Sequence, residues 1–246
     1  MSHAVRPPDA LDGLASALFR FRSVTPLPVL VAAVVLSWRA HIFPGPGGAL
    51  VDATLDVLGV CLSLGGLAVR IATAGFEPDA RPQTRRLAPA SLHTRGLYQL
   101  TRHPLYFGNA LITLGLLLVV HRPEAYLLVI PAFALEYGLF LRAEERALHE
   151  AFGSEWERWA DTVPMLLPRS RASGTFAGQR FDWRSAARRE VNAVVAWGVT
   201  ALTLLGWEWW ARELLTERRA FLVRVGVGGL LGLLLANKVW KKVQPK

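Results

Sequence analysis

The chain contains six apolar stretches that are long enough, or nearly long enough, to cross a lipid bilayer. Among its 246 residues they cover 25–43, 51–75, 105–120, 124–142, 191–210 and 220–240. The apolar core of a bilayer is about 30 Å thick, so a spanning helix needs about 20 such residues, and lipid cannot hydrogen-bond to an unpaired backbone. We therefore expect an all-α, polytopic integral membrane protein with about six transmembrane helices.

The basic residues predict how these helices are oriented. The net charge is +9, and 21 of the 28 Lys and Arg residues lie in 1–24, 76–104, 142–190 and 238–246. All four segments share one side of the membrane if the six stretches alternate in direction, and by the positive-inside rule that side is the cytoplasm. We therefore expect both termini in the cytoplasm, and anionic lipids rather than nucleic acid as partners of this charge. The Arg- and Ala-rich composition favours a bacterial inner membrane.

The polar segments divide the chain into four expected parts. Residues 1–24 carry apolar side chains at helical spacing over 9–22, which predicts an N-terminal interfacial helix. Residues 25–168 form the expected membrane core, 169–190 a basic linker, and 191–246 a C-terminal transmembrane hairpin with a basic tail. Gly153 is expected to break the helix after the fourth stretch. Gly228 and Gly232 form a GxxxG spacing, which indicates helix packing or arises by chance.

A first polar cluster opens the third apolar stretch. Its side chains able to serve a ligand are Tyr98, Arg102, His103, Pro104, Tyr106 and Gly108. Proline is favoured in the first turn of a helix, where free backbone N–H groups and the helix dipole attract an anion. The glycine allows a ligand or another backbone to approach closely, and the tyrosines offer ring faces and hydroxyls. The alternative is that Arg102 and His103 only anchor the helix among lipid phosphates.

A second polar cluster closes the fourth apolar stretch. Glu144 and Glu145 stand between Arg142 and Arg146, near the end of a helix whose dipole disfavours negative charge. Such a pair needs compensation, from the neighbouring arginines or from a cationic ligand. Because only a short turn at 121–124 joins the two stretches, they should run antiparallel and bring both clusters to the same face.

Taken together, the two clusters resemble the isoprenylcysteine carboxyl methyltransferase family of membrane enzymes, whose relatives include phospholipid N-methyltransferases. The matching motifs occur in order over about 95–168: Gly96-Leu-Tyr98, Arg102-His-Pro-Leu-Tyr-Phe-Gly108, Glu144-Glu145, Phe152-Gly-Ser-Glu-Trp156 and Val163-Pro164. Outside that window we find no resemblance, and the final hairpin departs from the small members of the family.

The resemblance implies a cytosolic site for S-adenosylmethionine and a lipophilic or lipidated acceptor that enters from the bilayer. Carried onto this sequence, the cofactor-binding residues are Tyr98, Arg102, His103, Pro104, Tyr106, Gly108, Glu144 and Glu145. Arg102 is the expected partner of the cofactor carboxylate, and the two glutamates of its ammonium or ribose hydroxyls. No metal is implied.

The catalytic candidates are Arg102, His103 and Glu136. A carboxylate acceptor needs no base, whereas an amine or thiol acceptor must lose a proton. His103 lies within the first cluster, and Glu136 is an ionisable residue inside a span, which is a functional candidate by default. Alternatively, Glu136 only pairs with Arg142 or Arg70.

Two other classes of protein stay open from the sequence alone. Membrane sterol reductases that use NADPH carry a similar Arg-His-Pro-x-Tyr helix opening, although they often place Glu where this chain has Asn109. A non-enzymatic transporter or assembly factor would instead require charges spread through the spans or inverted repeats. The Glu144–Glu145 pair favours the methyltransferase, with prenylcysteine carboxylate, phospholipid amine, small thiol and quinone or polyprenyl acceptors all open.

Overall fold

The described part of the chain is helical throughout. A computed structural model describes residues 48–78, 91–120, 122–169, 176, 178–211 and 215–243. The elements are α3 (Gly48–Phe76), the short 3-10 helix η1 (Gly96–Gln99), α4 (Pro104–Val120), α5 (Pro123–Phe152), α6 (Ser154–Ala160), α7 (Trp183–Ala211) and α8 (Glu217–Val243). No strand occurs within these ranges, so the all-α prediction is confirmed.

Five of the six apolar stretches form helices at the expected places. Four of them, α3, α5, α7 and α8, are long and apolar enough to cross a membrane, and α4 is a shorter apolar helix. The first expected span, 25–43, and the interfacial helix over 9–22 lie outside the described residues. The chain is an integral membrane protein, and the number of six spans stays a prediction.

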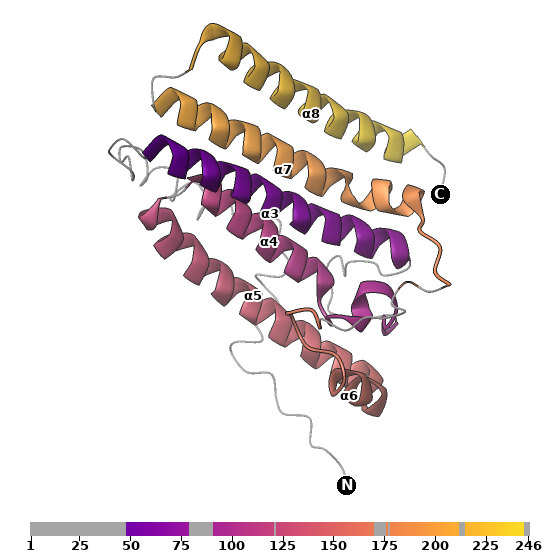
Figure 1. Cartoon of the computed structure of the whole chain (residues 1–246). Coiled ribbons are helices and arrows are strands. Elements are labelled where there is room, and N and C mark those ends of the chain that lie inside the picture. Colours follow the sequence, from indigo (N-terminus) through magenta and orange to yellow (C-terminus); the bar gives the residue numbers. More distant parts are fainter. Residues whose placement is uncertain are drawn as a thin grey trace.

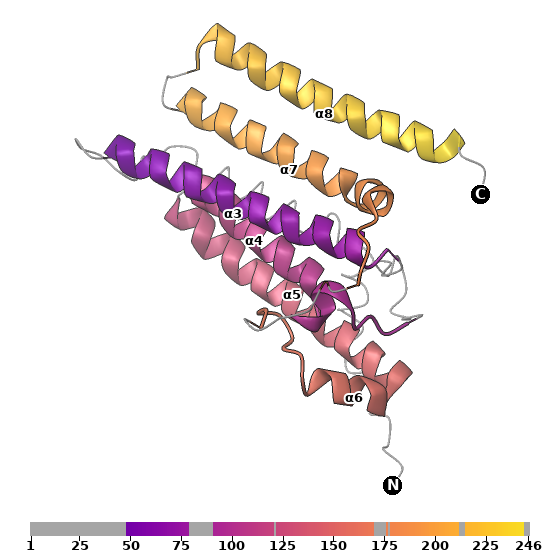
Figure 2. The same cartoon turned by 45° about the vertical axis from the view of Figure 1, so that its right-hand side comes forward.

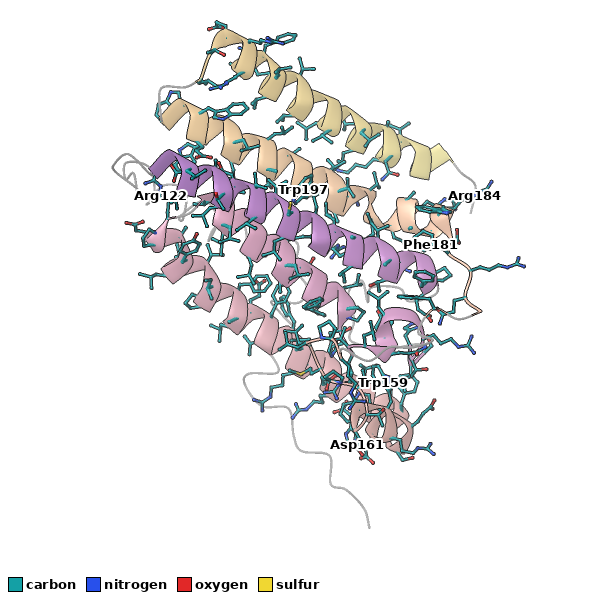
Figure 3. The ribbon with its side chains drawn as sticks, in the orientation of Figure 1. Arg122, Trp159, Asp161, Phe181, Arg184 and Trp197 are labelled. Carbon is teal, nitrogen blue, oxygen red and sulfur yellow. The ribbon has the colours of Figure 1, made fainter. Side chains whose placement is uncertain are left out.

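The long helices lie side by side, in the order α8, α7, α3, with α4 and α5 following on the other side of α3 (Figures 1 and 2). One end of the bundle contains the C-terminal ends of α3 and α5 and the N-terminal ends of α4 and α7. We call this end the rim. α6 lies at the rim beside the end of α5. Arg122 lies at the opposite end of the bundle, just before α5 (Figure 3). Its guanidinium carbon lies over the ring of Trp207 in α7, 6.0 Å from the ring centroid.

Two pairs of glycines set the contact between α3 and α4, the closest-packed helices of the bundle. Gly59 faces Gly115 and Gly66 faces Gly108, so that the two glycines of each helix are spaced seven positions apart. A Cβ atom on Gly59 would lie 2.5 Å from the carbonyl oxygen of Gly115, and one on Gly108 would lie 2.9 Å from that of Gly66. The two backbones are therefore in contact at both glycine pairs. These contacts fix the position of the first turn of α4 along the axis of α3.

The GxxxG spacing of α8 does not pack helices within the described chain. A Cβ atom on Gly228 or Gly232 would meet nothing within 4 Å. α8 instead contacts α7 through Gly226, beside Leu202, and through Leu230, which covers Gly198. The spacing predicted a contact because it cannot tell which face of a helix turns toward a neighbour.

Helix α7 begins earlier than the sequence suggested. Residues 183–190 were assigned to a basic linker, but α7 starts at Trp183. The Asp182 carboxylate accepts hydrogen bonds from the backbone N–H groups of Arg184 (2.9 Å) and Ser185 (3.1 Å), which is an N-terminal cap. The predicted break at Gly153 is confirmed, because this residue has φ +51° and separates α5 from α6.

The glycine pairs predict opposite effects for two adjacent substitutions. Gly66→Ala places its methyl group against the backbone of α4, 2.8 Å from the Ile112 amide nitrogen, and should lower the free energy of unfolding by about 1–3 kcal/mol. Gly65→Ala meets nothing within 4 Å and is the matched control, with unchanged or higher stability. Thermal unfolding in detergent measures both. Equal midpoints for the two variants would contradict the close approach of α3 and α4.

Candidate functional site

The segment before α4 is tied to the segment after α6 by backbone contacts. The Arg102 N–H donates to the carbonyl oxygen of Pro164 (2.9 Å), and the Arg169 N–H donates to that of Leu100 (2.9 Å). The buried Thr101 hydroxyl lies 3.0 Å from the carbonyl oxygens of both Met165 and Leu166. Residues 163–169 therefore form a strap across 100–103, and the Val163-Pro164 motif is part of it.

Arg102 joins this strap to α5. Its Nε and Nη2 donate to the two carboxylate oxygens of Glu145, at 3.1 and 2.6 Å. Its Nη1 donates to the carbonyl oxygens of Ala160 (2.8 Å) and Val163 (3.1 Å). The guanidinium also lies over the ring of Trp156, with 5.7 Å to the centroid. The two polar clusters thus meet at the rim, as the antiparallel hairpin predicted.

These contacts favour a positioning role for Arg102. All three of its guanidinium nitrogens already have protein acceptors, and a two-point arginine–carboxylate fork is one of the stronger polar contacts in proteins. The fork holds the opening of α4 against α5, and the carbonyl contacts hold the end of α6. Its expected contact with a cofactor carboxylate stays a prediction.

His103 is buried beside the glutamate pair. Its Nε2 hydrogen-bonds with Oε1 of Glu145 at 2.7 Å, and its Nδ1 lies 3.9 Å from Oε2 of Glu144. A proton on Nε2 would satisfy the shorter contact and leave Nδ1 as the acceptor. The ring of Tyr106 meets the imidazole edge to face, with 5.6 Å between centroids. Glu145 therefore fixes the orientation of the histidine.

Three buried polar atoms around this cluster have no hydrogen-bond partner among the described residues. They are Oε2 of Glu144 and the indole Nε1 atoms of Trp156 and Trp159. Trp159 is labelled at the rim in Figure 3. A buried polar atom without a partner costs about 1–3 kcal/mol, so such atoms commonly have a ligand or water as partner. One acceptor and two donors are thus available to a molecule that carries both a cation and hydrogen-bond acceptors.

Tyr98 lies on η1 next to the same cluster. Burial raises the pKa of its phenol, and the carboxylates of Glu144 and Glu77 raise it further, against an opposing effect of Arg189. The hydroxyl therefore stays protonated at neutral pH and can donate a hydrogen bond to a ligand. Tyr98 thus lies near Glu144, as the sequence led us to expect.

Of three other predicted site residues, one lies as expected and two do not face the rim. Pro104 is the first residue of α4, as its position in the motif predicted, and is buried. Gly108 was expected to admit the cofactor, but α3 occupies its open side, with Gly66 and the Arg70 side chain in contact. Glu136 is half-buried on α5, about 13 Å from Glu145 along the helix axis, so the helix separates it from the rim cluster.

Sequence reasoning missed a chain of polar contacts inside the bundle. Arg70 of α3 donates through Nε to Oε2 of Glu190 in α7 (2.7 Å) and through Nη1 to Oδ1 of Asn109 in α4 (2.6 Å). The Asn109 amide donates to the hydroxyl of Tyr137 in α5 (2.9 Å). The signal was present, because Arg70 interrupts an apolar stretch, but Glu190 fell within the expected linker.

The fork between Arg102 and Glu145 leads to a test of stability. Arg102→Lys keeps the charge but loses the two-point contact and the carbonyl contacts, so the free energy of unfolding should fall by about 2–4 kcal/mol without any ligand. Arg142→Lys, at an exposed position of the same rim, should change it by less than about 0.5 kcal/mol. Thermal unfolding in detergent compares the two variants. An unchanged midpoint for Arg102→Lys would show that the fork does not hold the rim together.

The segment that contains the two polar clusters is similar to known proteins. Residues 80–155 match the family model for phospholipid methyltransferase. Over 108 residues the chain is 38% identical to the cobalt-zinc-cadmium resistance protein CzcN of Cupriavidus metallidurans, a match that covers 44% of this chain and 49% of that protein. Over 105 residues it is 36% identical to methanethiol S-methyltransferase 2 of Bradyrhizobium diazoefficiens, covering 40% of this chain and 35% of that protein.

The matches are confined to part of each protein. The chain spans about half the length of the first of these relatives and about a third of the second. No solved structure matches the chain significantly. The family match includes η1, α4, α5 and the first two residues of α6, and leaves α3, the rest of α6, α7 and α8 outside. The resemblance predicted from the motifs is thus confirmed: residues 80–155 of this membrane protein are similar to the phospholipid methyltransferase family.

Proposed function

We propose that the chain transfers a methyl group from S-adenosylmethionine to a lipophilic acceptor at the cytoplasmic face of a bacterial inner membrane. The observation that carries this proposal is a set of buried polar atoms at the rim that have no hydrogen-bond partner among the described residues. They are Oε2 of Glu144, inside the segment that matches the phospholipid methyltransferase family, and Nε1 of Trp156 and Trp159, directly after that segment. The cofactor has an ammonium group and an adenosine moiety, which need an anion and hydrogen-bond donors respectively.

The rim residues fit these needs. Oε2 of Glu144 can accept from the ammonium group, and the indole N–H groups of Trp156 and Trp159 can donate to the nucleoside. Tyr98 adds a protonated hydroxyl. When bound, the cofactor supplies a methyl group on a positively charged sulfur, which an aromatic ring such as that of Tyr106 attracts. The positions of Arg102 and Glu145 are fixed by each other, which keeps this set of groups in place.

His103 is the proposed general base for an acceptor that carries a proton. With Nε2 bonded to Glu145, its Nδ1 can take the proton from a thiol or an amine. The resulting imidazolium would lie between the carboxylates of Glu144 and Glu145, which stabilise its positive charge. A thiol acceptor is the best supported class, because one relative is named as a methanethiol S-methyltransferase. Neither relative is named as an NADPH reductase.

Ligand binding to the folded state separates the methyltransferase from the reductase. S-adenosylhomocysteine at a hundred times its dissociation constant should stabilise the purified protein by about 2.7 kcal/mol, seen as a higher midpoint of thermal unfolding. NADPH over the same concentration range should leave the midpoint unchanged. Stabilisation by NADPH alone would overturn the proposed function in favour of the reductase.

Substitution of Glu144 tests the proposed contact with the ammonium group. Glu144→Gln keeps the size of the side chain and removes its charge, so the affinity for S-adenosylhomocysteine should fall about tenfold or more. Since Oε2 has no hydrogen-bond partner among the described residues, the stability of the ligand-free protein should not fall. Glu155→Gln, exposed in the first turn of α6, is the matched control with unchanged affinity. If the two variants bind alike, the cofactor contact is misplaced.

A further inference from the structure

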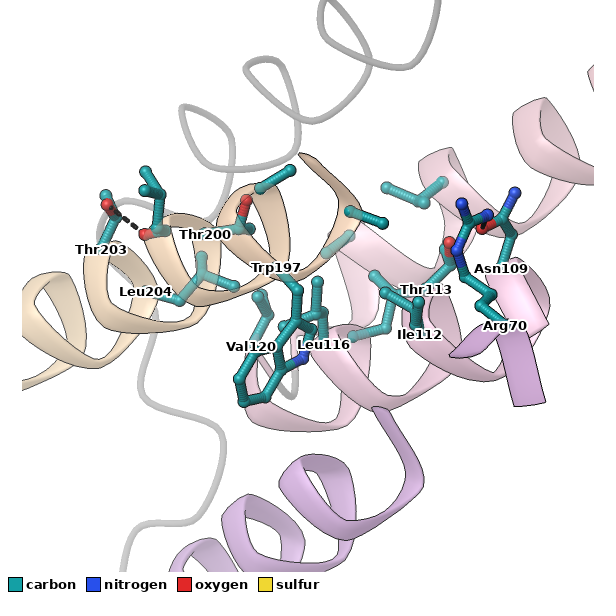
Figure 4. Close-up of a pocket in the computed structure, with 16 residues that line it drawn as sticks. Arg70, Asn109, Ile112, Thr113, Leu116, Val120, Trp197, Thr200, Thr203 and Leu204 are labelled. Atoms are coloured by element: carbon teal, nitrogen blue, oxygen red, sulfur yellow. Dashed lines mark hydrogen bonds between the residues drawn. The ribbon is translucent and has the colours of Figure 1, made fainter. Parts of the chain in front are cut away.

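A cavity of about 560 Å³ lies inside the bundle, between the matched core and the C-terminal hairpin (Figure 4). Its walls are mostly apolar and include Ile112, Leu116 and Val120 of α4, Val129 of α5, and Trp197 and Leu204 of α7. Trp197 is held at its place because its indole N–H donates to the buried Ser63 hydroxyl of α3 at 2.9 Å. Cavities of this volume and lining typically bind small apolar molecules.

One end of the cavity is polar. Arg70 and Asn109 line that end, and Figure 4 shows their side chains close together. The charge of Arg70 is matched by the buried carboxylate of Glu190 at 2.7 Å, so this end carries no net charge. A ligand whose head is an ion would therefore lose its hydration without gaining a counterion, which is costly. The chemistry of this end suits a small neutral group that donates or accepts hydrogen bonds.

The polar end of the cavity connects to the rim through packed side chains. The Asn109 amide donates to the Tyr137 hydroxyl at 2.9 Å, and the rings of Tyr137 and Tyr106 meet edge to face with 5.2 Å between centroids. Tyr106 in turn packs against His103. The head of a molecule in the cavity would thus lie on the side that faces the proposed base.

Helix α7 makes this cavity a feature of this chain rather than of the matched segment alone. Residues of α7 from Ala193 to Leu204 form one wall, and Glu190 supplies the counterion of Arg70. The family match ends at residue 155, so this wall lies outside it. The first helix of the C-terminal hairpin therefore supplies a wall that the matched segment lacks.

We propose that this cavity binds the acceptor, and that the acceptor is a compact single-chain lipophile with a small neutral head such as a thiol or hydroxyl. This inference rests on the proposed function for its catalytic meaning, but the binding itself does not. A two-chain phospholipid carries an ionic head and more apolar volume than a cavity for a drug-sized molecule accommodates. In apolar volume, the acceptor that we propose is thus larger than methanethiol and smaller than a membrane phospholipid.

Trp197 provides a direct readout, because bromine atoms quench the fluorescence of a nearby tryptophan. The protein in phosphatidylcholine nanodiscs is titrated with bromododecanol, and the same titration of Trp197→Phe gives the background from the other tryptophans. The difference between the two should show saturable quenching. Brominated diacyl phosphatidylcholine should give no saturable difference.

Filling the cavity tests its identity. Thr200→Phe places a ring in the cavity and should weaken the saturable quenching at least about tenfold, since overpacked sites exclude a ligand. Val225→Phe makes a similar change in size at an exposed position of α8 and should leave the quenching unchanged. Asn109→Leu should weaken bromododecanol about tenfold and leave bromododecane unaffected, because only the alcohol loses a hydrogen bond.

Each result bears on one part of the proposal: the binding site, the class of ligand or the methyl transfer. Quenching that never saturates, or that is equal in Thr200→Phe and the parent, would overturn the cavity as a binding site. Saturable quenching by the brominated phospholipid would overturn the single-chain ligand. Stabilisation by S-adenosylhomocysteine, measured on the same Thr200→Phe sample, should match the parent. If S-adenosylhomocysteine stabilises no variant while the quenching is intact, the proposed methyl transfer fails and the cavity site stands.

Discussion

The fork between Arg102 and Glu145 is the contact on which the rim of this protein depends. It joins the opening of α4 to α5, and the same guanidinium holds the carbonyl groups at the end of α6. α5 can supply the glutamate because it extends well beyond the apolar stretch that begins it. Because both charges are largely shielded from water, each needs the other to offset its lost hydration. The same contact positions His103 and Glu144, because they are the chain neighbours of Arg102 and Glu145.

A second constraint, the close packing of α3 against α4, fixes the position of this site along the axis of the bundle. The glycine pairs between α3 and α4 allow backbone contact at two levels, so α4 cannot slide along α3 without a clash. That register brings Arg70 of α3 level with Asn109 of α4, and Glu190 of α7 completes the contact. The hairpin outside the family match is thereby linked to the core by a buried ion pair.

Much of the site could be predicted because it follows from local rules. The proline at the start of α4, the break at Gly153 and the meeting of Arg102 with Glu145 follow from capping preferences and a short antiparallel turn. The contacts that were missed depend on which faces of distant helices meet. Glu190 finds Arg70 only because α7 begins early, at the Asp182 cap, and Gly108 serves α3 rather than a ligand because Gly66 lies opposite. Gly228 and Gly232 mislead for the same reason, since a spacing does not specify a partner.

The most direct test of the account is transfer of the methyl group itself. The protein in nanodiscs is incubated with S-adenosylmethionine carrying a tritiated methyl group and with dodecanethiol, and the organic phase is then assayed for label. The account predicts protein-dependent formation of labelled methyl dodecyl sulfide, reduced by filling the cavity and by removing the charge of Glu144. Absence of label in every lipophilic acceptor class offered, from a sample that binds S-adenosylhomocysteine, would contradict it.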